Sequence, residues 1–178
     1  MSFLAPSDFV GIVEQSTNEF TEDKMQSYID RYEPLFLRSL MGASMYDEFL
    51  ADLDTAPLIT PSSIPTDPKF TIIFEQFHLD DGNTNGCQHN SDGMVQMLKF
   101  FVMFQYSVDN QFDFAMTGAT KNSFSNSEIA QLNQTNAIDN YNEGVKTFHA
   151  IQWYICDNPV PYDYDNYNGQ KKEFMTWL

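Results

Sequence analysis

The chain has 178 residues, two cysteines and a formal net charge of −16 at pH 7. This length suits one domain with its own core. Two cysteines are too few for a disulfide framework, so we expect reduced thiols in an intracellular protein. The acidic residues are spread along the chain without a basic patch, which argues against binding of nucleic acid through its phosphates.

Aromatic residues are abundant: the chain contains 16 Phe, 9 Tyr and 2 Trp. A small domain has limited interior, so we expect part of this surplus to lie on surfaces, where aromatic side chains anchor interfaces. Composition therefore favours an interaction protein.

The first predicted helices follow from capping residues and an apolar period. Ser7 can cap a short helix around Asp8–Gln15, and Thr21, followed by acidic residues, can cap a longer one. The apolar residues of the longer helix recur about every 3.6 positions. They are Met25, Tyr28, Ile29, Tyr32, Leu35, Phe36 and Leu40.

Two residues are expected to interrupt this helix. Pro34 predicts a kink or a restart near Glu33, because proline is tolerated at the first helical position but breaks the bonding of a helix interior. Gly42 is typical of a helix C-cap. A further short helix is expected over residues 45–53.

Two long loops are predicted in the first half of the chain. Residues 54–69 contain four prolines, and a loop of this length is functional or mobile. Residues 80–92 are rich in Asp, Asn and Gly. The apolar segment between them, residues 70–79, fits a strand or a short helix, and we favour the helix because its neighbours are helical.

The apolar segment Met94–Tyr106 predicts the most buried helix. Ser91 and Asp92 can cap it, and its nearly continuous apolar surface must be buried on several sides. It is either the central core helix or a helix shared between the core and a subunit interface. A membrane span takes about 20 residues, so this segment is too short for one. The start of the chain has no signal-peptide pattern.

The last long helix is expected after a loop over residues 116–126, which has room for a short strand. Residues 125–127 can cap this helix, and Asn158-Pro159 ends it. Gly144 within it either allows a close helix crossing or is merely tolerated. The residues that share the apolar face are Ile138, Tyr141, Val145, Phe148, Ile151 and Ile155.

Beyond Asn158 the chain alternates Tyr and Asp, which cannot form a dry core. Such a segment can lie extended across another surface, with its rings burying area and its acids in water. A disordered tail is the alternative.

Possible metal ligands are weakly patterned. Asp81–Asp92 matches the first half of an EF-hand calcium loop, but it ends in Asp instead of the bidentate Glu. His78, Cys87 and His89 fit no zinc signature. We therefore predict neither a metal nor a cofactor.

No catalytic motif is visible. His149 lies beside the apolar face of the last helix, where a core or surface-edge histidine is commoner than a catalytic one. Ser and Cys have no nucleophile elbow around them, and there is no phosphate-binding glycine loop. We predict a protein that is not an enzyme and has no catalytic residues.

Three stretches carry a family resemblance. The first is Tyr28-Ile-Asp-Arg-Tyr-Glu-Pro-Leu-Phe-Leu-Arg-Ser-Leu-Met-Gly, followed by Met45-Tyr-Asp-Glu-Phe. The second covers residues 91–106 and leads to the Thr117-Gly118 turn, and the third joins Asn140-Tyr-Asn-Glu-Gly-Val to Gln152-Trp-Tyr-Ile. In this order they resemble the small helical head–tail connector proteins of tailed bacteriophages, especially those of crAss-like phages.

The resemblance implies a virion protein that forms a ring with itself, usually of twelve copies, beneath the portal protein. The ring extends the DNA channel and offers a platform for an adjacent tail or ring protein. DNA would pass through without specific binding, and assembly would take place in the host cytoplasm, with no membrane involved. The loop at residues 116–124 and the tail after Asp157 are in the places from which such proteins reach a neighbouring subunit.

The predicted fold is mainly α: a small helical bundle with long loops over residues 1–157, and an extended C-terminal arm over residues 158–178. The candidate core or inter-subunit anchors are Phe101, Phe104 and Tyr106, and the candidate arm contacts are Tyr162, Tyr164 and Tyr167. The alternative functions are a tail-terminator or tail-completion ring protein and, from a different class, a calcium-responsive binding module.

Overall fold

The computed structural model describes residues 2–9, 22–54, 63–79, 89–110, 112–115, 118–121, 127–162 and 167–175. The described part is mostly helical, as predicted. In chain order the elements are a 3₁₀ turn (Pro6–Phe9), α1 (Glu22–Asp54), α2 (Pro68–Phe74), β1 (Phe77–Leu79), β2 (His89–Ser91), α3 (Gly93–Asn110), β3 (Phe112–Ala115), β4 (Gly118–Lys121), α4 (Ser127–Asp157) and α5 (Pro159–Tyr162).

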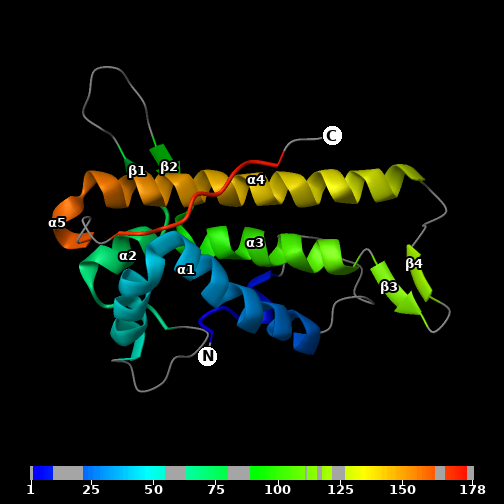
Figure 1. Cartoon of the computed structure of the whole chain (residues 1–178), viewed down its shortest axis with the longest axis horizontal. Coiled ribbons are helices and arrows are strands. Elements are labelled where there is room, and N and C mark those ends of the chain that lie inside the picture. Colours follow the sequence, from blue (N-terminus) through cyan, green and yellow to red (C-terminus); the bar gives the residue numbers. More distant parts are fainter. Residues whose placement is uncertain are drawn as a thin grey trace.

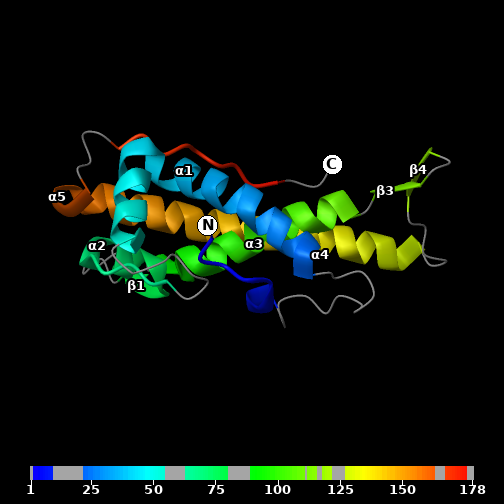
Figure 2. The same cartoon turned by 90° about the horizontal axis from the view of Figure 1, so that it is seen from below.

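Helices α3 and α4 run side by side in opposite directions, and α1 packs across them (Figures 1 and 2). Gly144 allows the close approach of α3 and α4, because a Cβ atom there would lie 2.9 Å from the Phe101 ring. The interpretation that Gly144 allows a close helix crossing is therefore confirmed.

Helix α1 contains one break, at Gly42, whose φ is 76° and ψ 175°. Glycine adopts this left-handed φ without strain, so the predicted helix end at Gly42 is confirmed. The predicted restart near Glu33 is wrong, because within α1 only Gly42 departs from helical backbone angles. Proline removes the hydrogen bond to the carbonyl of Asp30. Asp30 is exposed, so water can replace that bond.

The segment predicted as a helix over residues 70–79 is divided. Helix α2 ends at Phe74, and strand β1 begins at Phe77. The Asp67 side chain caps α2 by accepting a hydrogen bond from the Lys69 amide at 2.9 Å. Strand β1 pairs antiparallel with β2, which lies inside the predicted loop 80–92, so this loop is shorter than expected.

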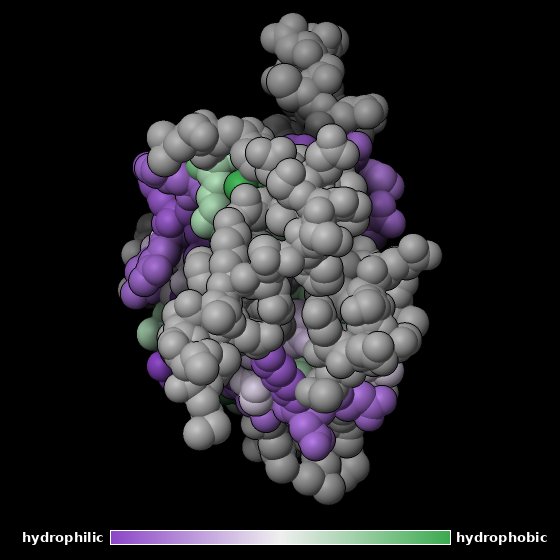
Figure 3. All heavy atoms as spheres, turned by 90° about the vertical axis from the view of Figure 1, so that its right-hand side faces the viewer, coloured by the Kyte–Doolittle hydropathy of each residue, from purple (hydrophilic) through white to green (hydrophobic). Residues whose placement is uncertain are grey.

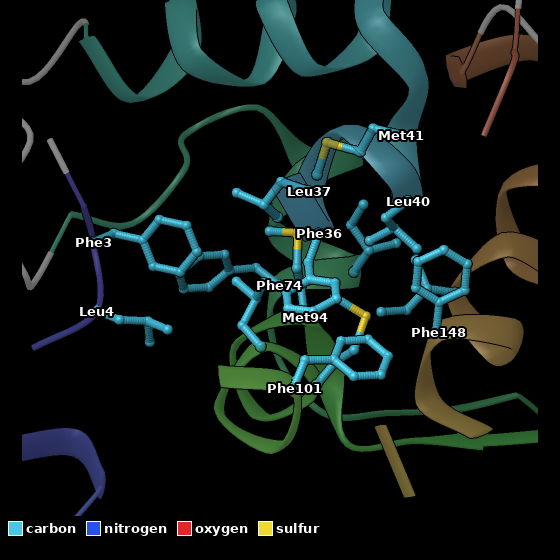
Figure 4. Packing of buried hydrophobic residues seen from close by; sticks show 14 of the residues in the cluster. Phe3, Leu4, Phe36, Leu37, Leu40, Met41, Phe74, Met94, Phe101 and Phe148 are labelled. Atoms are coloured by element: carbon cyan, nitrogen blue, oxygen red, sulfur yellow. The ribbon is translucent and has the colours of Figure 1, made fainter. Parts of the chain in front are cut away.

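The central-helix interpretation of α3 is confirmed, because its side chains form the middle of the hydrophobic core (Figure 4). Ser91 caps this helix as predicted, with its Oγ accepting a hydrogen bond from the Gly93 amide at 3.2 Å. Phe3 and Leu4 from the N-terminal segment complete the core on one side.

Strands β3 and β4 form an antiparallel hairpin beyond the ends of α3 and α4. They contact chiefly each other and the end of α3. The sequence allowed for a short strand within the predicted loop 116–126, and β4 is such a strand. Helix α4 ends at Asp157, as the Asn158-Pro159 pair predicts.

Candidate functional site

Four of the six aromatic candidate residues are buried within the chain itself. Tyr162 is buried, and its hydroxyl donates a hydrogen bond to the Lys69 carbonyl at 2.5 Å. Buried side chains of α3 include Phe101, Phe104 and Tyr106. Phe101, Phe104 and Tyr106 are therefore core residues, which is the first of the two roles expected for them. A contact of Tyr162 with a second subunit stays a prediction. Tyr164 lies outside the described residues.

The C-terminal arm, described over residues 167–175, lies extended across α1 and α4 of its own chain (Figures 1 and 2). The Tyr167 hydroxyl donates to the Leu40 carbonyl at 2.6 Å, and the Gln170 amide donates to the Ser39 carbonyl at 2.7 Å. A helix end leaves its last carbonyls without helical donors. The break at Gly42 therefore accounts for the two carbonyls that receive the arm.

Helix α4 supplies three polar side chains along the same segment. Gln152 Nε2 donates to the Gln170 carbonyl at 2.8 Å, and Asn142 pairs with both the amide and the carbonyl of Met175, at 2.9 and 3.1 Å. His149 Nε2 lies 2.7 Å from the Lys172 carbonyl. A carbonyl only accepts, so Nε2 of His149 carries the proton in this contact.

We call the residues that hold the arm by hydrogen bonds the arm-docking face. They are Ser39, Leu40, Asn142, His149 and Gln152. Gly169 is required for this contact, because a Cβ atom there would lie 2.5 Å from the Leu40 carbonyl oxygen. The extended tail was predicted, and the surface that it crosses belongs to the same chain.

Lys172 is the most distinctive residue of the arm. Its ammonium nitrogen lies 4.8 Å from the ring centre of Phe36, 5.6 Å from that of Phe101 and 5.5 Å from that of Phe148. The three rings come from α1, α3 and α4 respectively. Figure 4 shows them close together in the core.

A second polar site joins the N-terminal segment to α1. The carboxylate of Glu33, only 4% exposed, accepts hydrogen bonds from the Ser2 hydroxyl at 2.6 Å and from the amides of Phe3 and Leu4 at 3.3 and 3.2 Å. Burial raises the pKa of Glu33 to about 7, although these hydrogen bonds oppose the rise. Glu33 thus fixes the segment that places Phe3 and Leu4 in the core.

Glu33 predicts a pH dependence of stability. Its folded-state pKa of about 7 exceeds the ordinary value of 4.5. The folded chain therefore prefers the protonated form, and stability is lost as the pH rises from about 4.5 to about 7. The loss is on the order of 3 kcal/mol. We expect Glu33→Gln to reduce the destabilisation between pH 5 and pH 8, measured by urea unfolding. An unchanged pH dependence would contradict this account, and Glu143→Gln, at a half-exposed position on α4, is the control.

The candidate metal ligands lie partly outside the described residues. Most of the calcium-like loop Asp81–Asp92, and Cys87 of the possible zinc ligands, lie outside the described residues. His78 Nδ1 lies 2.9 Å from Asn90 Oδ1 across the β1–β2 pair. Within the described ranges, His, Cys, Asp and Glu form no cluster of three or more that could hold a metal ion.

Seen from the end that carries β3 and β4, the coloured surface is mostly hydrophilic, with a small apolar area (Figure 3). No helix in the described part of the chain is long and apolar enough to cross a membrane. No protein-family model, curated protein or solved structure shows a significant match to this chain.

Sequence reasoning missed both polar sites. Glu33 did leave a signal, because it lies four residues after Ile29 and four before Leu37, on the apolar face of its helix. The contact of Lys172 with three rings left none, because it joins four segments that are distant in the chain.

Proposed function

We propose that the chain is a non-enzymatic structural subunit of a ring between the portal and the tail of a tailed bacteriophage. The observation that carries this proposal is the order of the three stretches that resemble connector proteins. In the structure these stretches lie mainly on α1, α3 and α4, which pack on one another around the core. A shared core of this kind is what a common connector fold requires.

The β3–β4 hairpin supports the same proposal. An isolated two-stranded hairpin is marginally stable in water, and its outer edges present unpaired backbone groups. The hairpin extends past the bundle, in the region from which the resemblance expects a contact with a neighbouring subunit. Packing against a neighbour would stabilise it.

Exposed apolar side chains are the second support. A ring subunit buries two different patches, one against each neighbour, and such patches need apolar anchors. With the aromatic rings of α3 buried, the candidates are now other residues. These are Leu35, Ile64, Ile72, Val160 and Phe174, with exposed fractions from 43% to 92%.

The hairpin gives the decisive variant. We expect replacement of residues 112–121 by a short Gly-Ser linker to abolish ring formation and to leave the melting temperature within about 3 °C, because the hairpin contacts chiefly itself. The measurement is electron microscopy of the purified chain, alone and with the portal protein of its own genome, for both forms. The unaltered chain is expected to form rings that attach to the portal.

Three outcomes separate the alternatives. A chain that stays monomeric even with the portal protein would contradict the proposal. Rings that form but bind a tail tube instead of the portal would favour the tail-terminator function. Rings that form equally well without the hairpin would show that the neighbour contact lies elsewhere on the subunit, and would exclude the hairpin's role.

A further inference from the structure

The contact between Lys172 and the core is unusual for a charged residue. Lys172 is half-buried. A lysine that loses part of its hydration usually gains a charged partner, yet among the residues that the structure describes no carboxylate forms an ion pair with Lys172. Its ammonium group lies instead against three phenylalanine rings of the core.

The rings have the chemistry to replace part of the lost hydration. The face of an aromatic ring is electron-rich and attracts a cation within about 6 Å of its centre. All three rings satisfy that limit, and the three helices that carry them hold them in fixed positions. Phe36 stacks on Phe101 with ring centres 4.6 Å apart, and Phe101 lies edge-on to Phe148 at 6.2 Å.

We propose that Phe36, Phe101 and Phe148 form a binding site for an alkylammonium group, and that Lys172 is its built-in ligand. The site does not depend on the proposed ring function. Its consequence is that the charge on Lys172 holds the arm against α1 and α4. The hydrogen bonds of the arm-docking face give the arm its position, and the cation gives it most of its residence time.

The neighbouring lysine is a matched control. Lys171 has the same charge and precedes Lys172 on the same arm, but it is exposed and contacts none of these rings. Replacement of either residue by methionine shortens the side chain by one heavy atom and removes one positive charge. A general effect of charge would therefore appear in both variants, whereas the loss of the cation from the ring site would appear only in Lys172→Met.

The arm carries its own reporters. The Gln170 amide donates to Ser39, and the Met175 amide donates to Asn142, so both are protected from hydrogen exchange only while the arm is docked. In the full-length chain we expect Lys172→Met to accelerate exchange at both amides at least tenfold, and Lys171→Met to change it less than twofold. Equal exchange rates in the two variants would overturn the proposal.

Chemical rescue tests the ligand class. Lys172→Ala removes the atoms of a propylammonium ion, so added propylammonium is expected to restore slow exchange at Gln170 and Met175. The neutral analogue 1-propanol has the same number of heavy atoms and is expected to restore little. Rescue by 1-propanol as strong as by propylammonium, or rescue by neither compound, would show that the site does not select a cation and would refute the proposal.

Discussion

Replacement of Phe101 by alanine is expected to lower the free energy of unfolding by about 3–5 kcal/mol. The Phe101 ring is fully buried and contacts the rings of Phe36, Tyr141 and Phe148. Its loss would leave a cavity at the crossing of α3 and α4. The two helices already approach closely at Gly144, so they have little room to move together and refill that cavity. Urea unfolding followed by circular dichroism measures the effect.

The control for this variant is another phenylalanine. Phe174 is 48% exposed and touches the ring of His149, so Phe174→Ala is expected to cost less than about 1 kcal/mol. If Phe101→Ala cost as little as Phe174→Ala, Phe101 would not be a core residue, and its earlier interpretation as a subunit anchor would return.

Replacement of Gly93 by alanine is expected to cost about 3–4 kcal/mol. Gly93 has a φ of 85°, and an added Cβ atom would lie 2.5 Å from the carbonyl carbon and oxygen of Glu75. The left-handed backbone and the steric clash act together, because the clash is with backbone atoms that cannot rotate away. The expected damage is the separation of the start of α3 from the end of α2.

Thermal unfolding measures the effect of Gly93→Ala, with Asp92→Ala as its neighbour control. Asp92 is exposed, so its loss is expected to cost less than about 1 kcal/mol. A Gly93→Ala chain that unfolds like the unaltered protein would mean that α2 and α3 are not in contact at this point.

The helices could be predicted from the sequence because each leaves a local signal. The apolar period of α1, the long apolar run of α3 and the spaced apolar face of α4 each lie within one window of the chain. Gly42 and Ser91 were equally visible, because helix ends depend on one residue type at one position. The β1–β2 pair was missed, since three-residue strands have too few positions to show an alternation.

The destination of the aromatic residues could not be predicted. Part of the surplus of rings was expected on surfaces, without saying which rings. The described chain exposes Trp153 and Phe174 and places many other rings in its own core, where they pack edge-on or stacked against one another. The composition gives the number of aromatic rings, but it does not give the volume between the crossing helices that these rings can fill. The candidate sites depend on such three-dimensional packing, and so does the surface that the arm covers.

The arm is attached by contacts that follow one another along an extended segment of the chain. Tension that pulls its far end away from the bundle would break them in sequence, first at Met175, then at Lys172, Gln170 and Tyr167. Only afterwards would the load reach Tyr162 and the packed helices. We therefore expect the arm to detach in steps under tension before the packed helices carry the force.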